Sequence, residues 1–315
     1  MSYKKYYAGF DVGGTKFDAV LFTDDGHIVE RILDKGGNPV DLGFDNAKVH
    51  YLGILNRLFE KADGGHIETL YGSVAAVEYY GDKLTKWLEA NLDIGKIRVE
   101  GDGVCLISGM LGHVDGASMI CGTGSSLYFR KGEEYGHTGG WGHLIDSCGS
   151  GYVLGHLALK AACRAQDGRA QPTLLNELIE KKIGRTIWED YIRIYSEGRA
   201  YIAQFAECVF AARKRGDAVA NDIFNICAKD LGDVAFSAYR SMGKPFDMVL
   251  NGGIFAHFPE YVEAVKAACP EQVNVIMSDV PPVYGCAVEA LYDAGMCADE
   301  TFKKNFLGDY EKISV

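Results

Sequence analysis

The first forty residues alternate apolar and polar positions in short runs that are separated by turn-forming residues. The runs Tyr6–Val12, Phe17–Phe22 and His27–Leu33 have the two-residue period of β-strands. Gly13 and Gly14 separate the first two runs, and a turn rich in Asp and Gly at residues 23–26 separates the last two. We therefore expect an antiparallel meander of three strands whose first corner is formed by glycine.

The pattern then changes to alternating helices and strands. Apolar side chains recur on one helical face between residues 45 and 62. The next segments are typical of strand, helix and strand: Thr69–Val77, Lys83–Asn91 and Ile97–Val99. Two further strand-like runs, Ser118–Cys121 and Ser126–Arg130, flank a second glycine corner. The chain thus begins the same arrangement twice, which predicts two α/β domains of similar plan.

Long amphipathic helical stretches follow Gly151. They cover Tyr152–Gln166, Leu174–Lys182 and Tyr201–Met242, and strands return at Phe246–Leu250 and Val273–Met277, each followed by a helix. We expect one domain at 1–117, completed by the C-terminal helix at about 283–315, and a second at 118–282 with a helical insertion at about 152–243. Because no Pro- or Ser-rich linker separates them, we expect the two domains to enclose a hinged cleft.

Composition narrows the range of partners. The chain has 315 residues with a net charge of −11, and this acidity argues against a general nucleic-acid or anionic-membrane binder. Its 9 cysteines are scattered without a C-x-x-C pair, which is typical of a reduced compartment. No uncharged apolar run approaches the roughly 18 residues that cross a bilayer, and the N-terminus has no signal-peptide pattern. We expect a cytoplasmic protein with a homodimer as the default assembly.

Glycine is over-represented, and its placement carries the first functional signal. Of 39 glycines, 15 lie between Gly101 and Gly155. At the first corner, the backbone of Gly13 and Gly14 can reach positive φ and approach an anion, and Thr15 and Lys16 add a hydroxyl and a charge. The spacing is not that of a Walker P-loop, because a strand rather than a helix follows. The alternative is a plain hairpin.

Two further glycine corners resemble the first in chemistry. The second, with Thr123, Gly124 and Ser125, lies between two strands and can form another anion cradle, or simply a structural turn. The third, Gly252 and Gly253, ends a strand and opens a helix, where a flat ligand could lie against the backbone. A tight strand-to-helix turn explains it equally well.

These corners resemble the two phosphate motifs and the adenosine motif of the actin-hexokinase ATPase superfamily. Within it, the run Gly139-Gly140-Trp141-Gly142-His143 followed by Gly149-Ser150-Gly151-Tyr152 resembles the signature of the N-acetylglucosamine kinase-like group, the BadF/BadG/BcrA/BcrD ATPase family. The likeness extends from about Tyr7 to Gly295. It implies two actin-like (ribonuclease H-like) domains around a cleft, with ATP at the three corners.

Catalytic and metal-binding roles can be assigned to two aspartates. Asp11, at the end of a buried strand beside the first corner, suits a water-mediated contact to Mg²⁺, which prefers a carboxylate and retained waters. The resemblance implies that Asp102 is the general base that takes a proton from the attacking hydroxyl. The residues alone also allow Asp102 to be a helix N-cap, and both roles are compatible.

The resemblance also implies substrate contacts. Asn38 matches the loop asparagine with which the family holds its sugar. From the local sequence alone, it would be a turn residue. Gly140, Trp141 and Gly142 would face the substrate, with Trp141 either a pocket wall or a packing residue. The chain departs from the family at Asp146: the usual Asp-Glu pair is replaced, its acidic residue is displaced by one position, and its glutamate is lost.

The function expected from these features is an ATP- and Mg²⁺-dependent kinase for a sugar or amino sugar hydroxyl of the N-acetylglucosamine or glucosamine type. Two alternatives remain. The same family contains ATPase activators of acyl-CoA dehydratase or reductase partners, which bridge a dimer with an iron-sulfur cluster, and Cys121 and Cys148 lie near the corresponding region. A non-catalytic, sugar-binding regulator is the other, but the chain has no helix-turn-helix pattern for DNA binding.

Overall fold

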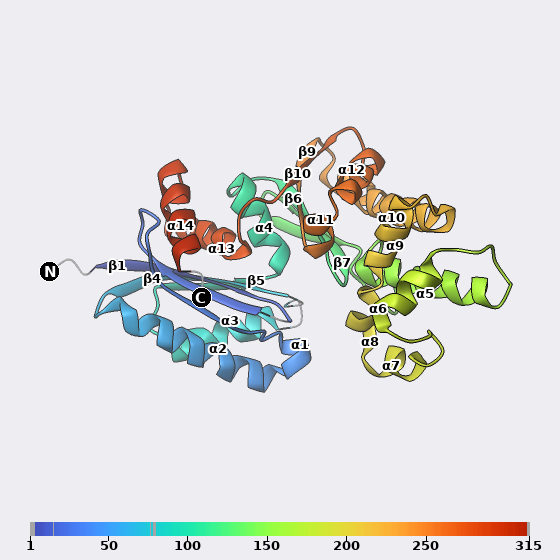
Figure 1. Cartoon of the computed structure of the whole chain (residues 1–315). Helices are drawn as coiled ribbons and strands as arrows, with labels where there is room; N and C mark the ends of the chain where they lie inside the picture. Colours follow the sequence, from blue (N-terminus) through green and yellow to red (C-terminus); the bar gives the residue numbers. More distant parts are fainter. Residues whose placement is uncertain (1–3, 15, 76, 78–79, 314–315) are drawn as a thin grey trace. The chain divides into compact units, whose positions relative to one another are not determined.

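The computed structural model describes residues 4–14, 16–75, 77 and 80–313 (Figure 1). The chain forms two compact units, one from residues 1–115 with 278–315 and the other from 116–277. Thr15, one of the residues expected to bind ATP, lies outside the described residues. Within the described part, no helix combines the length and the apolar character needed to cross a membrane.

The first unit is built on a five-stranded sheet in the order β3-β2-β1-β4-β5. Its strands are β1 (Lys5–Val12), β2 (Lys16–Phe22), β3 (Ile28–Lys35), β4 (His66–Val74) and β5 (Lys96–Glu100). β1, β2 and β3 pair antiparallel, so the predicted meander is confirmed, whereas β1, β4 and β5 run parallel. The carboxyl ends of these parallel strands therefore meet at one edge of the sheet, which is where ligand sites form in open α/β sheets.

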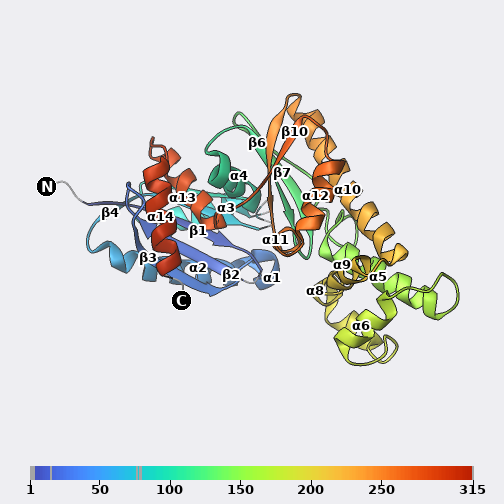
Figure 2. The same cartoon turned by 45° about the horizontal axis from the view of Figure 1, so that its top comes forward.

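Helices cover both faces of this sheet (Figures 1 and 2). The helices from the first part of the chain are α1 (Pro39–Leu42), α2 (Phe44–Phe59), α3 (Gly81–Asn91) and α4 (Asp102–Leu111), and a short 3₁₀ turn (Glu60–Ala62) follows α2. The end of the chain adds α13 (Pro282–Asp293) and α14 (Glu300–Lys312) to the same unit. α2 and α3 lie on one face, and α13 and α14 on the other. Aromatic residues such as Phe10, Phe17 and Tyr51 fill the core beneath α2, with ring centroids between 5.1 and 5.8 Å apart.

α13 packs unusually close to α4, the helix that carries Asp102. A Cβ atom on Gly285 would collide with the backbone carbonyl of Cys105, so glycine sets the spacing of the two helices. Replacing Gly285 with alanine should lower the free energy of unfolding by about 1–3 kcal/mol, as overpacking does. Gly308→Ala in α14 is the matched control, because a Cβ atom there would have no described atom within 4 Å outside its own helix backbone and chain neighbours, and it should raise stability by about 0.5–1 kcal/mol. Urea denaturation measures both, and equal shifts would contradict the prediction.

The second unit repeats the plan of the first. Its sheet has the order β10-β9-β6-β7-β8, with strands β6 (Gly116–Cys121), β7 (Ser125–Lys131), β8 (Glu134–Thr138), β9 (Phe246–Asn251) and β10 (Val273–Met277). β6 pairs antiparallel with β7 and parallel with β9, as β1 does with β2 and β4. The sequence analysis did not predict β8, because its polar, largely exposed side chains do not alternate like those of a half-buried strand.

A block of helices lies between β8 and β9. It contains α5 (Gly151–Gln166), α6 (Leu175–Ile183), α7 (Tyr191–Ser196), α8 (Gly198–Ala203), α9 (Ala206–Lys214) and α10 (Ala218–Met242), and α11 (Gly253–His257) and α12 (Pro259–Ala268) follow β9. The stretch Tyr201–Met242, expected to be continuous from its amphipathic pattern, is broken into three helices. Gly216 takes φ 83°, and the Asp217 carboxylate caps α10 by accepting from the Ala220 amide at 2.8 Å.

Candidate active site

Three polar side chains lie in one row across the parallel strands of the first unit. Asp11 on β1 is in register with Ser73 on β4, and Ser73 is in register with Glu100 at the end of β5. Neighbouring strands are about 4.8 Å apart, so this row spans roughly 10 Å. Asp102 follows two residues beyond the end of β5. The topology therefore brings the predicted metal ligand Asp11 and the predicted base Asp102 to the same edge of the sheet.

A chain of hydrogen bonds runs from the Asp11 carboxylate to the backbone of Asp102. The Ser73 hydroxyl donates to the Asp11 carboxylate at 2.8 Å, and the Cys105 thiol lies 3.2 Å from the Ser73 oxygen. The same thiol is 3.1 Å from the backbone carbonyl of Asp102, one turn earlier in α4. Ser73 and Cys105 are fully buried. The sequence analysis missed both, since nothing in their local pattern shows that they meet.

The surroundings of Asp11 suit a magnesium ligand. Burial raises the pKa of Asp11 to about 6, while the hydrogen bond from Ser73 and the charge of Lys16 act in the opposite direction. The carboxylate is therefore ionised at neutral pH and keeps one oxygen that Ser73 does not use. Mg²⁺ is held in phosphotransferases by one or two carboxylates together with substrate phosphates and waters. Asp11 fits that requirement, and its water-mediated contact to Mg²⁺ stays a prediction.

The corner between β1 and β2 is a tight hairpin in which the Gly13 amide donates to the Lys16 carbonyl at 2.9 Å. Gly13 does not use the positive φ that glycine makes accessible, because its φ lies outside that range. A Cβ atom added to Gly13 would have no described atom beyond its chain neighbours within 4 Å, so the corner is open to a ligand. The Lys16 ammonium binds Asp18 at 2.8 Å, which already neutralises part of its charge.

Asp102 is half-buried and occupies the first helical position of α4. The N-cap is Gly101, whose backbone is extended, so the alternative that Asp102 itself caps the helix is wrong by one position. A carboxylate in the first turn is still favoured by the helix dipole. The role of Asp102 as general base stays a prediction.

Asn38 lies in a loop that is tied to the first corner. The Gly37 amide donates to the Gly13 carbonyl at 3.3 Å, and the buried Tyr51 hydroxyl donates to the Gly37 carbonyl at 2.8 Å. The side-chain oxygen of Asn38 accepts from the Val40 amide at 2.8 Å and caps α1. Asn38 is thus the turn residue that local chemistry predicts, and its amide nitrogen remains for a substrate contact.

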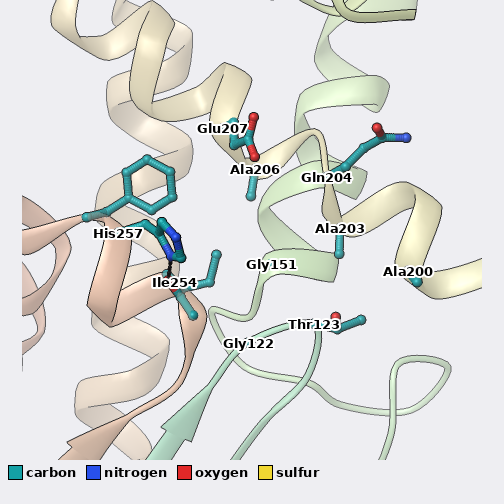
Figure 3. Close-up of a pocket in the computed structure, with 12 residues that line it drawn as sticks. Gly122, Thr123, Gly151, Ala200, Ala203, Gln204, Ala206, Glu207, Ile254 and His257 are labelled. Carbon is teal, nitrogen blue, oxygen red and sulfur yellow. Dashed lines mark hydrogen bonds between the residues drawn. The ribbon is translucent and has the colours of Figure 1, made fainter. Parts of the chain in front are cut away.

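The second unit contains a cavity of about 610 Å³ (Figure 3). Its base is formed by Gly122 and Thr123 of the second corner and by Gly151 at the start of α5. α8 and α9 line one side, and Ile254, His257 and Phe258 of the α11 region line the other. The His257 ring is held by the Gly253 carbonyl at 2.7 Å. The volume lies within the range of small-molecule sites, and the third glycine corner opens directly into it.

Glycine is obligatory at the third corner. Gly252 takes φ 111°, and a Cβ atom there would collide with the carbonyl oxygen of Cys121 at the end of β6. β9 ends at Asn251 and α11 begins at Gly253, which confirms the predicted strand-to-helix junction. Glu207 and His257 also line the cavity but were not predicted from the sequence, although His257 stands one helical turn after Gly253.

The second corner is joined to α5. The amides of Gly151 and Tyr152 donate to the carbonyls of Gly122 and Thr123 at 2.8 and 3.0 Å. Within the described part of the chain, no hydrogen bond uses the amides of Thr123 or Gly124. These donors, placed beside the N-terminus of a 16-residue helix, form a polar end to the cavity that suits phosphate oxygens. The Ser125 hydroxyl instead donates inward, to the Ser147 carbonyl at 2.8 Å.

The loop that follows β8 presents its aromatic residue to solvent. Trp141 is 62% exposed and lies 5.7 Å from the His137 ring, so it is not a packing residue of its own unit. Gly140 and Gly142 take φ values of 74° and 89°, and the Asp146 amide donates to the Gly142 carbonyl at 2.9 Å. This closed turn directly follows the exposed Trp141, whose role as a wall of the sugar site stays a prediction.

The displaced Asp146 is engaged locally. Its carboxylate accepts from the Cys148 amide at 3.3 Å and from the Cys148 thiol at 2.9 Å. Ser147 is buried, and its hydroxyl lies 3.0 Å from that of Ser150. Asp146 thus hydrogen-bonds within its own loop, and the next residue, Ser147, is the buried one.

Comparison with known proteins settles the family. The model of the BadF/BadG/BcrA/BcrD ATPase family matches residues 8–290. The chain belongs to this ATPase family. It is 29% identical over 272 residues to an N-acetyl-D-glucosamine kinase of Dictyostelium discoideum, covering 79% of this chain and 85% of that protein. It is also 29% identical over 239 residues to an N-acetylmuramic acid/N-acetylglucosamine kinase of Clostridium acetobutylicum, covering 72% and 77%.

A solved structure supports the fold. The chain superimposes on a Chromobacterium violaceum protein provisionally described as an N-acetylglucosamine kinase with a TM-score of 0.70 at 19% identity, covering 90% of this chain and 98% of that one. The predicted family and the predicted actin-like ATPase fold are thus confirmed. The individual site residues remain predictions from sequence and geometry.

Proposed function

We propose that the protein is an ATP-dependent kinase that phosphorylates a hydroxyl group of an amino sugar, of the N-acetylglucosamine or glucosamine type. One observation carries this proposal: the strand register of β1, β4 and β5 brings Asp11 and the half-buried Asp102 to the same edge of the sheet, where Ser73 hydrogen-bonds the Asp11 carboxylate. A kinase needs this pairing of a base with a magnesium carboxylate, whereas simple ATP binding does not. The two curated relatives, both named as amino sugar kinases, point the same way.

The mechanism assigns each group a step. The Asp102 carboxylate accepts the proton of the sugar hydroxyl while the hydroxyl oxygen attacks the γ-phosphorus, and ADP leaves with the electron pair of the broken bond. Asn38 and the Gly140–Gly142 loop orient the sugar. ATP binds at the three glycine corners, whose residues are Gly13, Gly14, Thr15, Lys16, Thr123, Gly124, Ser125, Gly252 and Gly253. Mg²⁺ supplies charge neutralisation at the phosphates, and Asp11 would hold it, through water.

The first alternative, an electron-delivering activator, is disfavoured by the cysteines. Cluster ligands are thiolates. Burial, together with a hydrogen bond to Asp146, raises the pKa of Cys148 to about 12, and burial raises that of Cys121 as well. Cys121 is also fully buried. Because the Cys121 side chain has no exposed surface, it is not placed to bind a cluster that bridges two subunits.

A panel of sugars assayed for ADP release tests the proposed function. N-acetylglucosamine, glucosamine, N-acetylmuramic acid and glucose should be compared, with the phosphorylated product identified by mass spectrometry. We expect turnover with an amino sugar at least tenfold above glucose. ATP hydrolysis that no sugar accelerates, together with an iron-containing preparation, would instead support the activator.

Ser73 offers a test of how Asp11 is oriented. Ser73→Ala removes a hydrogen bond to a carboxylate, worth about 1.5–3 kcal/mol in a protein. We expect the Mg²⁺ concentration for half-maximal rate to rise about tenfold, with kcat at saturating Mg²⁺ changed less than about threefold, because about 1.4 kcal/mol corresponds to tenfold in an equilibrium. Calorimetry of Mg²⁺-ADP binding should show the same loss without turnover. Ser73→Thr, which keeps the hydroxyl, should restore the affinity, and an unchanged Mg²⁺ dependence in Ser73→Ala would refute the role.

A further inference from the structure

The second unit holds another cavity, of about 420 Å³. It shares no lining residue with the cavity of about 610 Å³ at the second and third glycine corners, which is called the nucleotide pocket below. The smaller cavity lies between α5 and the α7–α8 pair. Its apolar lining includes the buried Leu159 and Ile187 and the half-buried Ile194 and Ile202. This volume is within the range of sites for small organic molecules, and such sites are mostly apolar with a few polar groups.

Aromatic rings form both walls of this cavity. On α5, the Tyr152 and His156 rings stack with centroids 5.9 Å apart. On the opposite side, the Tyr191 and Tyr195 rings lie 4.9 Å apart on α7. All four residues line the cavity, and three of them are exposed, so these rings do not belong to the protein core. Their faces can hold a flat apolar body by stacking.

The ionisable lining residues other than Tyr and Cys are all basic. They are His143, His156, Lys160 and Arg199, and no Asp or Glu is among the lining residues, although the chain carries a net charge of −11. Among the described residues, Lys160 and Arg199 form no ion pair, whereas Arg185 and Arg193 nearby bind Asp190 and Glu197. In this acidic protein the cavity is thus a local site of uncompensated positive charge, which attracts an anion.

We propose that this cavity binds an organic anion with a flat apolar body, such as an aromatic carboxylate. Lys160 and Arg199 bind the anionic group, Arg through its planar fork of donors. The tyrosine rings enclose the apolar body. Neither the nucleotide pocket nor the proposed catalytic residues take part in this recognition.

The position of the cavity gives the bound anion a route to the sugar site. His143 lines the cavity and ends the Gly139–His143 loop, and its ring packs edge-on against Tyr152 at 5.0 Å. An anion that contacts His143 therefore changes the conformational mobility of the loop that carries Trp141. This regulatory step rests on the proposed function, because it assumes that the loop holds a sugar. Such coupling must be reciprocal between the two ligands.

A matched pair of probes tests the binding. 1-Naphthoate and its neutral analogue 1-naphthylmethanol are titrated into the full chain by calorimetry, without ATP or sugar. We expect naphthoate to bind at least tenfold more tightly than the alcohol. The Lys160→Gln/Arg199→Gln variant should lose that preference, while Arg240→Gln/Lys266→Gln, with the same change in net charge at exposed positions outside the cavity, should keep it.

The outcomes separate the proposal from its rivals. Equal affinity for both probes, or an equal effect of the two double variants, overturns the anion site. Trp188 is 80% exposed, and its ring stacks on that of the lining residue Tyr191 with centroids 5.8 Å apart, so it would lie in any interface that covers the cavity. A stable dimer that binds naphthoate only after Trp188→Ser dissociates it would show that a second copy covers the cavity, and would overturn the proposal too. A severalfold change in the sugar KM with naphthoate, absent in Lys160→Gln/Arg199→Gln, supports the regulation, and an unchanged KM overturns that part. Because binding is measured without turnover, it stands or fails independently of kinase activity.

Discussion

Replacing Asp102 with asparagine should lower kcat by about 10²- to 10⁴-fold, the contribution that a positioned general base makes. The carboxamide has nearly the same shape as the carboxylate but cannot accept the proton of the attacking hydroxyl. The fold should survive, because Gly101 rather than Asp102 caps α4. Loss of one acidic residue in the first turn costs only about 0.3–1 kcal/mol through the helix dipole.

The measurement combines turnover with binding. Steady-state ADP release with the best sugar gives kcat, and calorimetry gives the affinity for ATP, which should change less than about twofold because the corner residues are untouched. Asp93→Asn is the matched control: it is the same substitution at an exposed position in the loop before β5, and its activity should equal that of the unmodified protein. A kcat for Asp102→Asn within about threefold of normal would remove Asp102 from the mechanism.

The largest expected loss of stability comes from Asp18→Asn. The buried Asp18 carboxylate binds the Arg31 guanidinium through two hydrogen bonds of 2.9 Å and accepts from the Tyr310 hydroxyl at 2.6 Å, which ties α14 to the sheet. Asparagine leaves the Arg31 charge buried without its counter-ion. Breaking a buried pair in this way costs about 3–5 kcal/mol. Urea denaturation at pH 7 should show that loss.

The pH dependence gives this prediction a second readout. Burial alone would raise the pKa of Asp18, but the hydrogen bonds from Arg31, Lys16 and Tyr310 outweigh it and lower that pKa below its ordinary value. A depressed carboxyl pKa contributes stability above the unfolded-state pKa of about 3.9, and this stability is lost as the pH falls through the folded-state pKa. The gap in stability between Asp18→Asn and the unmodified protein should therefore narrow below about pH 4.

Asp34→Asn provides the contrast for this pair. Asp34 also faces an arginine, Arg57, but at 3.7 Å and on the surface, with 62% of the Arg57 side chain exposed. Exposed pairs contribute about 0–1 kcal/mol. If Asp34→Asn cost as much as Asp18→Asn, burial would not be the source of the effect.

Several elements followed from local pattern alone. The alternation of Tyr6–Val12 and Phe17–Phe22 predicted strands that the structure contains, because each inward-facing side chain meets the same core. The junction at Gly252 was predictable because its backbone takes φ 111°, a conformation that favours glycine whatever the rest of the fold. Breaks between helices were harder: the amphipathic pattern of Tyr201–Met242 continues through Gly216, and only the cap formed by Asp217 shows where α10 begins.

The family, the repetition of the domain plan and the positions of the glycine corners between their elements could all be predicted without coordinates, since they depend on short-range patterns. Which side chains meet depends on the three-dimensional arrangement instead. Ser73 binds Asp11, 62 positions away in the chain, because β1 and β4 pair in register. The cavity at the second and third glycine corners likewise brings Gly122 and His257 together, and the smaller cavity beside α5 brings Lys160 and Arg199 together. Hydrogen bonds and charges act over a few ångströms in space, so their partners are fixed by strand register and helix packing, which local sequence does not encode.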